Sequence, residues 1–473
     1  MDKHIKESQF STLPVTNGER SLGLLDSSLI NIGWGIATWC FLTGGLLALL
    51  VDFKTAVIIS FVGNTLGVIL ASLASTIPST KYGIDTYTSI ISFLGKNGMK
   101  IILAIFLITN IGWVVVLASM IARSCQNIYE AVAGKIPPGW TFPTITIIAV
   151  LLTWWLVVKG PSALKIMNRI MVPGLLIVVV IMIISLILRY DLETIVNSKA
   201  IDPYEGSLLN IIFVFELCLG AGLSWWPGLG ALGRLNKTSP SSFWGNVIGL
   251  SFACVAMNVL SAAAAYSIGG SDPTTWMIPL GGVTLGIIAL IFVILANMTS
   301  NSFVMYNTCL GLKQFNIFSN KKWIIVSGSF AVPVIIISFF PDFVYGNYQM
   351  LLNFCVALFG PLSVLQLLDY YVFRKQTINL RSIYNKTNTS DYYYIMGVNW
   401  AAVIIFILSI VTYCVILNPV TWACSSIFTI TTASIPSMVI CFITYYIYGK
   451  MVIIPKNIGN VNHYKNRQEI TKE

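Results

Sequence analysis

Two hydroxyl side chains stand next to each other in a long apolar run at 277–311. Thr299 and Ser300 follow Ala296 by three and four residues, a spacing that brings all three to one face of a helix. Two hydroxyls and one backbone carbonyl form a hard oxygen site suited to a small cation. Alternatively, both hydroxyls bond back to carbonyls of their own helix, as Ser and Thr often do.

A second source of oxygen ligands is the stretch ATWCFLTGG at 37–45, inside the first apolar run. Three residues that weaken this run fall together there: Thr43, Gly44 and Gly45. Glycine destabilises a helix, and hydrocarbon tolerates unpaired carbonyls only where they are buried in protein or line a cavity. We therefore predict a broken helix whose carbonyls at Ala37 and Cys40 complete a five-oxygen Na⁺ site. The alternative is a helix contact packed through glycine.

One carboxyl, Glu216, is placed deep in an apolar run, at 207–232. A carboxyl at that depth is costly and indicates a functional role. Gly220, Ala221 and Gly222 are predicted to interrupt this helix, and Glu216 shares a face with Gly220 at spacing i, i+4. We expect Glu216 to contact a ligand or to titrate. The alternative is a protonated carboxyl bonded to a neighbouring helix.

Asn110 and Trp113 share a face of the apolar run at 98–122. Together they offer an amide and a stacking surface, which suits a planar heterocycle. A single tryptophan in such a run also serves in core packing or as an interface anchor.

The composition predicts an integral membrane protein, because 56% of the 473 residues are hydrophobic and only 10% are charged. Apolar runs of about 20 residues, the length of a membrane helix, recur along the whole chain. We predict twelve membrane helices at about 27–51, 55–77, 98–122, 141–158, 168–189, 207–232, 242–267, 277–311, 323–340, 348–373, 395–417 and 425–448. The nine cysteines are scattered and the two histidines, His4 and His463, lie in the tails. Disulfides, metal ligation by these residues and histidine-based catalysis are therefore not expected.

The positive charges behind the net charge of +10 are distributed unevenly between the loops on the two sides of the membrane. With these helices, 23 of the 28 Lys and Arg residues fall on one side of the membrane. By the positive-inside rule both termini are expected in the cytoplasm of a cell-membrane protein, and the charge does not indicate nucleic acid as a partner.

The two predicted helix interruptions, in the first and sixth helices, occupy matching positions in two halves. This arrangement predicts an all-α fold with a five-plus-five inverted repeat. The expected organisation is a cytoplasmic tail at 1–26, a core at 27–373 with repeats at about 27–189 and 207–373, peripheral helices at 374–448 and a second cytoplasmic tail at 449–473.

Short motifs then match a known family in register along the chain. In order, they are TWCFLTGG at 38–45, NIGW at 110–113, PSALKIMNRIMVP at 161–173, MTSNSFVMYNTCLGL at 298–312, LLDYY at 367–371 and GVNWAA at 397–402. On these pieces the chain resembles the nucleobase–cation symporter-1 family of purine, cytosine and hydantoin permeases, and the bacterial cytosine permeases most closely.

The resemblance implies the inverted-repeat symporter fold, with substrate near the membrane midplane between the first, third, sixth and eighth helices. By motif, the family's Na⁺ ligands fall on the carbonyls of Ala37, Cys40 and Ala296 and the hydroxyls of Thr299 and Ser300. The family's stacking tryptophan falls on Trp113, its polar neighbour on Asn110 and a polar position of the eighth helix on Asn301.

The sixth helix departs from the family. Leu219 stands where the family has a second aromatic residue, and Gly228 where it has an acidic residue after the proline. Phe215 or Trp225 could replace the aromatic side chain, and Glu216 has no counterpart in the pattern. Substrate contacts are therefore expected at Asn110, Trp113, Glu216, Leu219, Gly220 and Asn301. The substrate is left open among cytosine, other pyrimidines, purines, hydantoin-like rings and vitamin precursors.

The resulting expectation is a monomeric secondary active transporter, without a cofactor, that imports a small nitrogen heterocycle together with Na⁺ or H⁺. An amino-acid or amine symporter of the same fold is the first alternative, with Glu216 paired to the substrate ammonium. A membrane enzyme or sensor is the second, although the membrane helices carry no nucleophile–base constellation.

Overall fold

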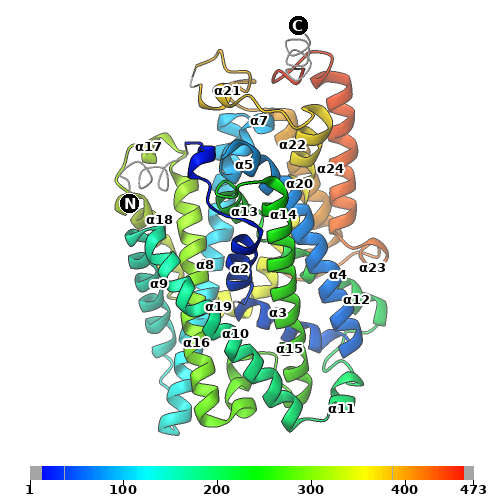
Figure 1. Ribbon diagram of the computed structural model, residues 1–473. Coiled ribbons are helices and arrows are strands. Elements are labelled where there is room, and N and C mark those ends of the chain that lie inside the picture. Colours follow the sequence, from blue (N-terminus) through cyan, green and yellow to red (C-terminus); the bar gives the residue numbers. More distant parts are fainter. Residues whose placement is uncertain (1–12, 37, 386, 463–473) are drawn as a thin grey trace.

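The structure is a computed structural model that describes residues 13–462 apart from 37 and 386. Every helix or strand element in this part of the chain is a helix, and the long helices run side by side along one axis (Figure 1). The long helices, with the π-helical segments that continue them, are α4–η2–α5 (Phe53–Tyr82), α8 (Lys96–Ala133), α9 (Thr141–Lys159), α10 (Pro161–Arg189), α12 (Ser207–Leu223), α13 (Trp226–Gly233), α14–η3–α15 (Ser239–Ile268), α16 (Pro273–Leu312), α18 (Trp323–Ile337), α20–η4 (Tyr348–Phe373), α22 (Trp400–Ile416) and α24–η5 (Ser434–Ile453).

The membrane-spanning prediction is confirmed. In the described part of the chain, eight helical spans are long and apolar enough to cross a membrane. The bent pair α2 (Leu24–Gly35) and α3 (Thr38–Leu50) makes a ninth. Three shorter apolar helices, at Pro173–Arg189, Trp323–Ile337 and Trp400–Ile416, stand where the other three predicted spans lie.

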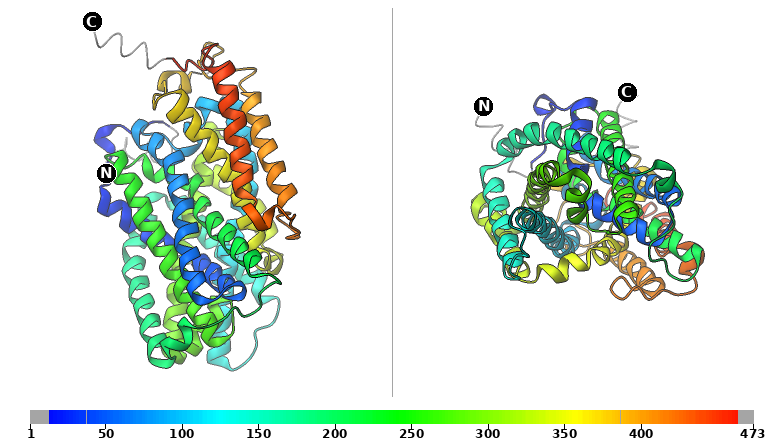
Figure 2. Two further views of the ribbon diagram at one scale, coloured as in Figure 1. Left: turned by 90° about the vertical axis from the view of Figure 1, so that its right-hand side faces the viewer. Right: turned by 90° about the horizontal axis from the view of Figure 1, so that it is seen from below.

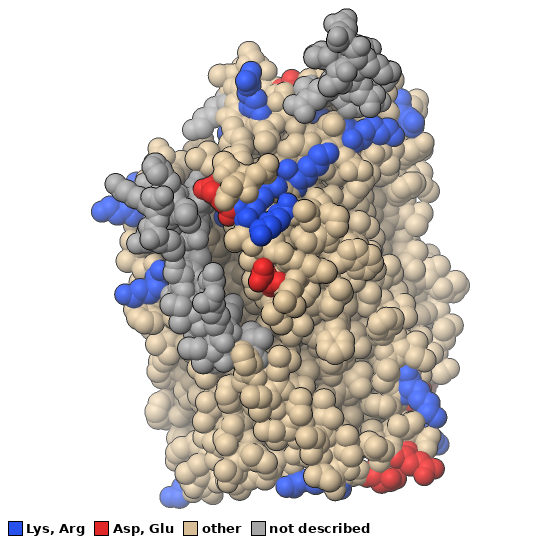
Figure 3. All heavy atoms as spheres, in the orientation of Figure 1, with Lys and Arg blue, Asp and Glu red and all other residues tan. Residues whose placement is uncertain are grey.

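The surface has the pattern expected of a protein surrounded by lipid. Charged side chains gather toward the two ends of the molecule, with a broad uncharged surface between them (Figure 3). On α9, Ile148, Leu151, Leu152 and Trp155 are exposed at helical spacing, which forms an apolar stripe on the outside. Such a stripe is stable only against hydrocarbon, because in water it would be left uncovered.

The first predicted helix is interrupted close to the start of the 37–45 stretch and not at its glycines. The helix α2 ends at Gly35 and α3 begins at Thr38, and the two helices meet at 59°. Gly44 and Gly45 lie inside α3, and an added Cβ on Gly44 would overlap the carbonyl oxygen of Asn258 in α15 (Phe252–Ile268). The expectation that Thr43, Gly44 and Gly45 weaken this helix was therefore wrong, because the glycines serve close packing of α3 on α15.

The sixth predicted helix is also interrupted a few residues away from the expected place. It stops at Leu223 and starts again at Trp226, with Pro227 in the first turn of α13, where proline is well tolerated. An added Cβ on Gly220 would lie 2.7 Å from Val356 Cγ2 in α20 (Tyr348–Leu367), and one on Gly222 would overlap α4 (Phe53–Ala71). The break predicted at Gly220–Gly222 was thus wrong, since the glycines let α12 pack tightly between α4 and α20.

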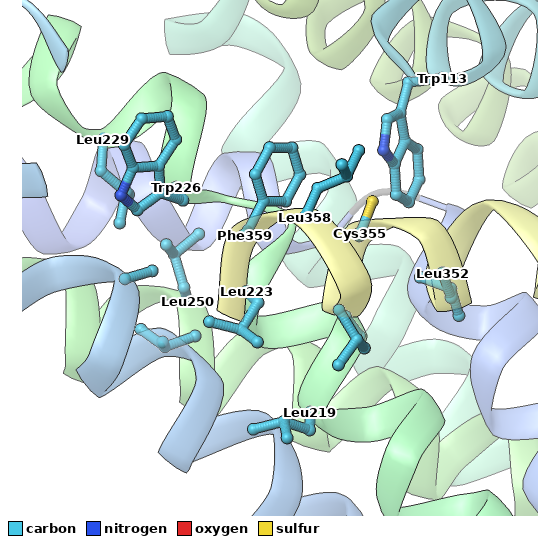
Figure 4. Packing of buried hydrophobic residues seen from close by; sticks show 14 of the residues in the cluster. Trp113, Leu219, Leu223, Trp226, Leu229, Leu250, Leu352, Cys355, Leu358 and Phe359 are labelled. Atoms are coloured by element: carbon cyan, nitrogen blue, oxygen red, sulfur yellow. The ribbon is translucent and has the colours of Figure 1, made fainter. Parts of the chain in front are cut away.

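The core lies between these elements. Figure 4 shows Cys355 and Phe359 of α20 between Trp113 of α8 and the broken helix α12–α13. Phe359 stacks on Trp226 with ring centroids 6.0 Å apart. The helices α22 and α24 pack on each other and on α20, at one side of the bundle seen from below in Figure 2.

Candidate ligand-binding cavity

A cavity lies where the two interrupted helices face α8 and α16, with about 590 Å³ of empty volume. Its lining comes from α2, α3, α8, the α12–α13 interruption and α16: Trp34, Trp39, Asn110, Trp113, Leu117, Ser224, Trp225, Pro227, Gly228, Ser300, Phe303, Val304 and Asn307. The interruptions therefore open the space, and the two long helices close it.

Aromatic side chains form most of the walls. Trp39 meets Trp113 edge to face at 5.6 Å between centroids and Trp225 at 5.5 Å. On the α2 side, Trp34 stacks on Phe303 at 3.6 Å. Flat apolar faces at these angles suit a planar ring, because aromatic pairs prefer stacked or edge-to-face arrangements.

The polar groups of the lining are neutral. The Asn110 amide donates to Thr308 Oγ1 at 3.0 Å, which fixes its orientation, and Ser224 Oγ donates to the Ala221 carbonyl at 2.7 Å. Ser300 Oγ is buried without a hydrogen-bond partner among the described residues. No charged side chain of the described chain lines the cavity. The cavity therefore favours an uncharged ligand that forms hydrogen bonds.

Two of the six predicted substrate contacts, Asn110 and Trp113, line the cavity. Asn301 lies outside the lining and donates to the Val114 carbonyl at 3.2 Å, so it ties α16 to α8. Leu219 is buried in the packing around α12, and Gly220 faces α20. Of the two possible aromatic replacements in the sixth helix, Trp225 is in the lining.

The Glu216 carboxyl faces the peripheral helices. Ser434 Oγ of α24 donates to Glu216 Oε2 at 2.8 Å, and the hydroxyls of Thr432 and Ser434 lie 3.0 Å apart. Glu216 is fully buried and does not line the cavity. This contact with a neighbouring helix is the one that the alternative interpretation of Glu216 expects.

Four of the predicted cation ligands, Cys40, Ala296, Thr299 and Ser300, lie on α3 and α16, which pack against each other. Thr299 Oγ1 donates to the Ala296 carbonyl of its own helix at 2.7 Å, which is the bond that the alternative interpretation expects for this hydroxyl. With its amide oriented to satisfy both neighbours, Asn258 donates to the Cys40 carbonyl at 2.6 Å. Ala37 lies outside the described residues. Hard oxygens and the unpartnered hydroxyl of Ser300 fit a small cation.

Several lining residues were missed from the sequence. Phe303 and Asn307 lie three and seven residues after Ser300, so they continue the helix face already identified there. That spacing could have revealed them. Trp34 and Ser224 carry no comparable signal, because they reach the cavity only through the positions of the two interruptions.

The sequence pattern of a family described as "permease for cytosine/purines, uracil, thiamine, allantoin" matches residues 14–445. The chain belongs to this family. The predicted relationship is thereby confirmed, and the protein is a membrane transporter of the family and not an enzyme. Among curated proteins, the chain is 23% identical over 433 residues to the purine-uracil permease NCS1 of Arabidopsis thaliana, covering 84% of this chain and 69% of the relative.

Solved structures share the fold of this transporter. Mhp1, a nucleobase–cation–symport-1 family transporter, in a closed conformation with bromovinylhydantoin bound, matches with a TM-score of 0.73 at 17% identity, over 93% of this chain and 95% of that one. The inward-facing conformation of Mhp1 matches with a TM-score of 0.77 at 17% identity, over 96% of this chain and 97% of that one. A Na⁺-coupled sialic acid symporter matches with a TM-score of 0.64 at 12% identity, over 95% of this chain and 94% of that one. The predicted all-α symporter fold is confirmed.

Proposed function

We propose that this transporter imports a neutral, planar nitrogen heterocycle by symport with Na⁺. The observation that carries the proposal is the cavity between the two interrupted helices, with its aromatic walls and uncharged polar groups. A purine, a pyrimidine such as uracil, or a hydantoin has the matching shape and hydrogen-bonding edge. Names of relatives point to the same class, since one is a purine-uracil permease and another was solved with bromovinylhydantoin bound.

The amide of Asn307, next to Gly228, is the group proposed to bind the polar edge of the substrate. A Cβ at Gly228 would lie 2.8 Å from Asn307 Nδ2 and 2.9 Å from the Phe303 ring. At the position where the family pattern has an acidic residue, this chain therefore has no space for a side chain, because Asn307 and Phe303 pack against the backbone of Gly228. A carboxamide both donates and accepts, whereas a carboxylate only accepts, so the cavity suits a ring edge that carries a donor beside an acceptor.

The Na⁺ site of this proposal consists of the carbonyls of Ala37, Cys40 and Ala296 with the hydroxyls of Thr299 and Ser300. Support comes from the unpartnered Ser300 hydroxyl, which lies next to Thr299 on α16. Because Ser300 also lines the cavity, cation and substrate share a helix face. Binding of each is expected to tighten binding of the other, which couples the two fluxes.

Transport follows alternating access, in which one helix bundle moves against the other around the cavity. The unequal distribution of Lys and Arg supports the proposal that both termini of this cell-membrane transporter face the cytoplasm. A single chain contains the whole cavity, so the monomer is the proposed functional unit.

The amine-symporter alternative requires a carboxylate in the cavity to pair with the substrate ammonium. Glu216 instead contacts Ser434, outside the lining. A buried ammonium without a counter-charge is strongly disfavoured. The geometry therefore favours the neutral heterocycle over the amine.

The test is uptake into vesicles that contain the purified protein. Labelled uracil, cytosine, adenine, allantoin and an amino acid are compared with and without an inward Na⁺ gradient. We expect uptake of at least one heterocycle, stimulated by Na⁺. Uptake of the amino acid alone contradicts the substrate class, and heterocycle uptake driven by a pH gradient regardless of Na⁺ contradicts the cation site.

A matched pair of variants sharpens this test. Ser300→Ala removes the hydroxyl that lines the cavity, whereas Ser302→Ala removes one that donates to the Met298 carbonyl of its own helix at 2.7 Å. Only Ser300→Ala should raise the Na⁺ concentration that supports half-maximal uptake.

A further inference from the structure

A second pocket lies far from the cavity, at the end of the molecule that carries α7 (Ile91–Leu94) and α21 (Leu380–Tyr384) (Figure 1). It has about 630 Å³ of empty volume between the first turn of α8 and the connection from α21 to α22. Six of its lining residues carry the argument: Lys96, Asn97, Lys100, Asn385, Thr387 and Ser390. Asn97 and Thr387 are exposed, so the pocket opens to the surface.

The charge of this pocket is positive. Lys96 and Lys100 are one helical turn apart on α8 and both are half-buried, and Lys100 Nζ donates to Asn97 Oδ1 at 3.3 Å. No carboxylate lines the pocket in the described part of the chain. The adjoining Asp391 lies outside the lining and accepts hydrogen bonds from Asn379 at 2.8 Å and from Ser382 at 2.7 Å. An anion is the complementary ligand.

The polar walls are held in place before any ligand binds. The backbone amides of Asn97 and Gly98 both donate to the Gly397 carbonyl, at 2.8 and 3.2 Å. The start of α8 therefore has its partners already, and the attraction comes from the two ammonium groups and the side-chain donors. On the opposite wall, Thr387 Oγ1 donates to Asn385 Oδ1 at 2.8 Å, which orders that part of the rim.

Exposed apolar residues are the sequence neighbours of two lining residues of this pocket. Ile395 and Met396 directly precede the lining residue Gly397 and are 68% and 76% exposed, and Ile317, next to Asn316, is 70% exposed. A free phosphate or another soluble anion has no apolar part that could cover these side chains. A phospholipid has one, because its headgroup carries the negative charge and its acyl chains cover apolar surface.

We propose that this pocket binds the phosphate headgroup of an anionic phospholipid, with acyl chain against Ile395 and Met396. The lipid joins the first turn of α8 to the 387–397 connection. Since α8 also carries Asn110 and Trp113, the bound lipid braces one wall of the cavity. The inference goes beyond the proposed transport function and does not depend on which substrate is carried.

The test measures lipid binding to the full-length protein in detergent by native mass spectrometry. The probes are phosphatidylglycerol, phosphatidylcholine and free glycerol 3-phosphate. We expect phosphatidylglycerol to bind in preference to phosphatidylcholine. Lys96→Gln with Lys100→Gln should weaken phosphatidylglycerol binding by about thirty-fold, since each lysine near an anionic headgroup contributes about a factor of five.

The matched control is Lys321→Gln with Lys322→Gln, which removes the same charge from two exposed lysines outside the pocket. This control should leave phosphatidylglycerol affinity unchanged. Equal losses in both double variants, or no preference for phosphatidylglycerol, would overturn the proposal. Met396→Gln separates the two sources of phosphate, because it should weaken the lipid only. Binding of glycerol 3-phosphate as tight as that of the lipid would assign the pocket to a soluble anion instead. All these readouts are independent of uptake, so failure here is distinguishable from failure of the transport proposal.

Discussion

Replacing Trp113 by alanine tests whether the aromatic wall holds the substrate. The Trp113 ring is 6% exposed and packs edge to face on Trp39 at 5.6 Å and on Tyr348 at 5.9 Å. Removing a buried tryptophan costs about 3–5 kcal/mol of stability. Loss of an aromatic stacking face costs about 1–3 kcal/mol per bound base. We therefore expect the substrate Kd to rise roughly 5- to 150-fold.

The control must suffer the same loss of packing without touching the cavity. Trp276 is fully buried, packs edge to face on Phe41 at 5.7 Å and does not line the cavity. Trp276→Ala should lower the unfolding temperature about as much as Trp113→Ala and leave the Kd unchanged. Trp113→Phe keeps a ring and should recover part of the affinity.

The assay is equilibrium binding of a labelled heterocycle to purified protein, with the thermal unfolding midpoint measured on the same samples. If Trp113→Ala lowers the midpoint but keeps the Kd, the tryptophan only packs the core and the cavity assignment is refuted. The same conclusion follows if Trp276→Ala raises the Kd equally.

Three further predictions concern single positions. Ser300→Ala should raise the Na⁺ concentration required for uptake about tenfold or more, because a hydrogen-bonding group that faces a charge contributes about 1.5–3 kcal/mol. Unchanged Na⁺ dependence would contradict the site. Gly44→Ala should destabilise the protein by about 1–3 kcal/mol and lower its unfolding midpoint, because the added Cβ would overlap the Asn258 carbonyl. Gly139→Ala should leave the midpoint unchanged, because no atom lies within 4 Å of the added Cβ. Glu216→Gln keeps an acceptor for Ser434 and should retain uptake, while Glu216→Ala should lose about 1–3 kcal/mol of stability. Loss of uptake in a well-folded Glu216→Gln protein would show that the carboxyl takes part in transport.

The buried ion pair at the end of α20 could not be predicted from the positions of its two residues in the sequence. Asp369 lies near the end of an apolar run, where an acidic residue would be expected to reach water. In the structure it is 1% exposed and pairs with Arg374 at 2.6 Å. Arg374 also donates to the carbonyls of Ser92 and Gly459. Segments far apart in sequence thus satisfy one guanidinium, and no local pattern could have indicated that.

Local sequence was enough to predict the helices and that they cross a membrane. Each span is encoded by about 20 consecutive apolar residues, and that property is local, so Phe53–Tyr82 or Lys96–Ala133 could be placed without knowing any contact. The cavity face of α16 was partly within reach for the same reason, since Ser300, Phe303 and Asn307 share a helical period.

The roles of the glycines and of the buried carboxyl depend on contacts that exist only in the folded bundle. A glycine weakens a helix or permits close packing, and the choice depends on whether another backbone lies against it, as Asn258 does at Gly44 and Leu352 at Gly220. Likewise, Glu216 shares a helix with the cavity region, yet its direction was fixed by Ser434, more than two hundred residues away. Periodicity gives the face of a helix, but the identity of the neighbour on that face is a property of the folded bundle.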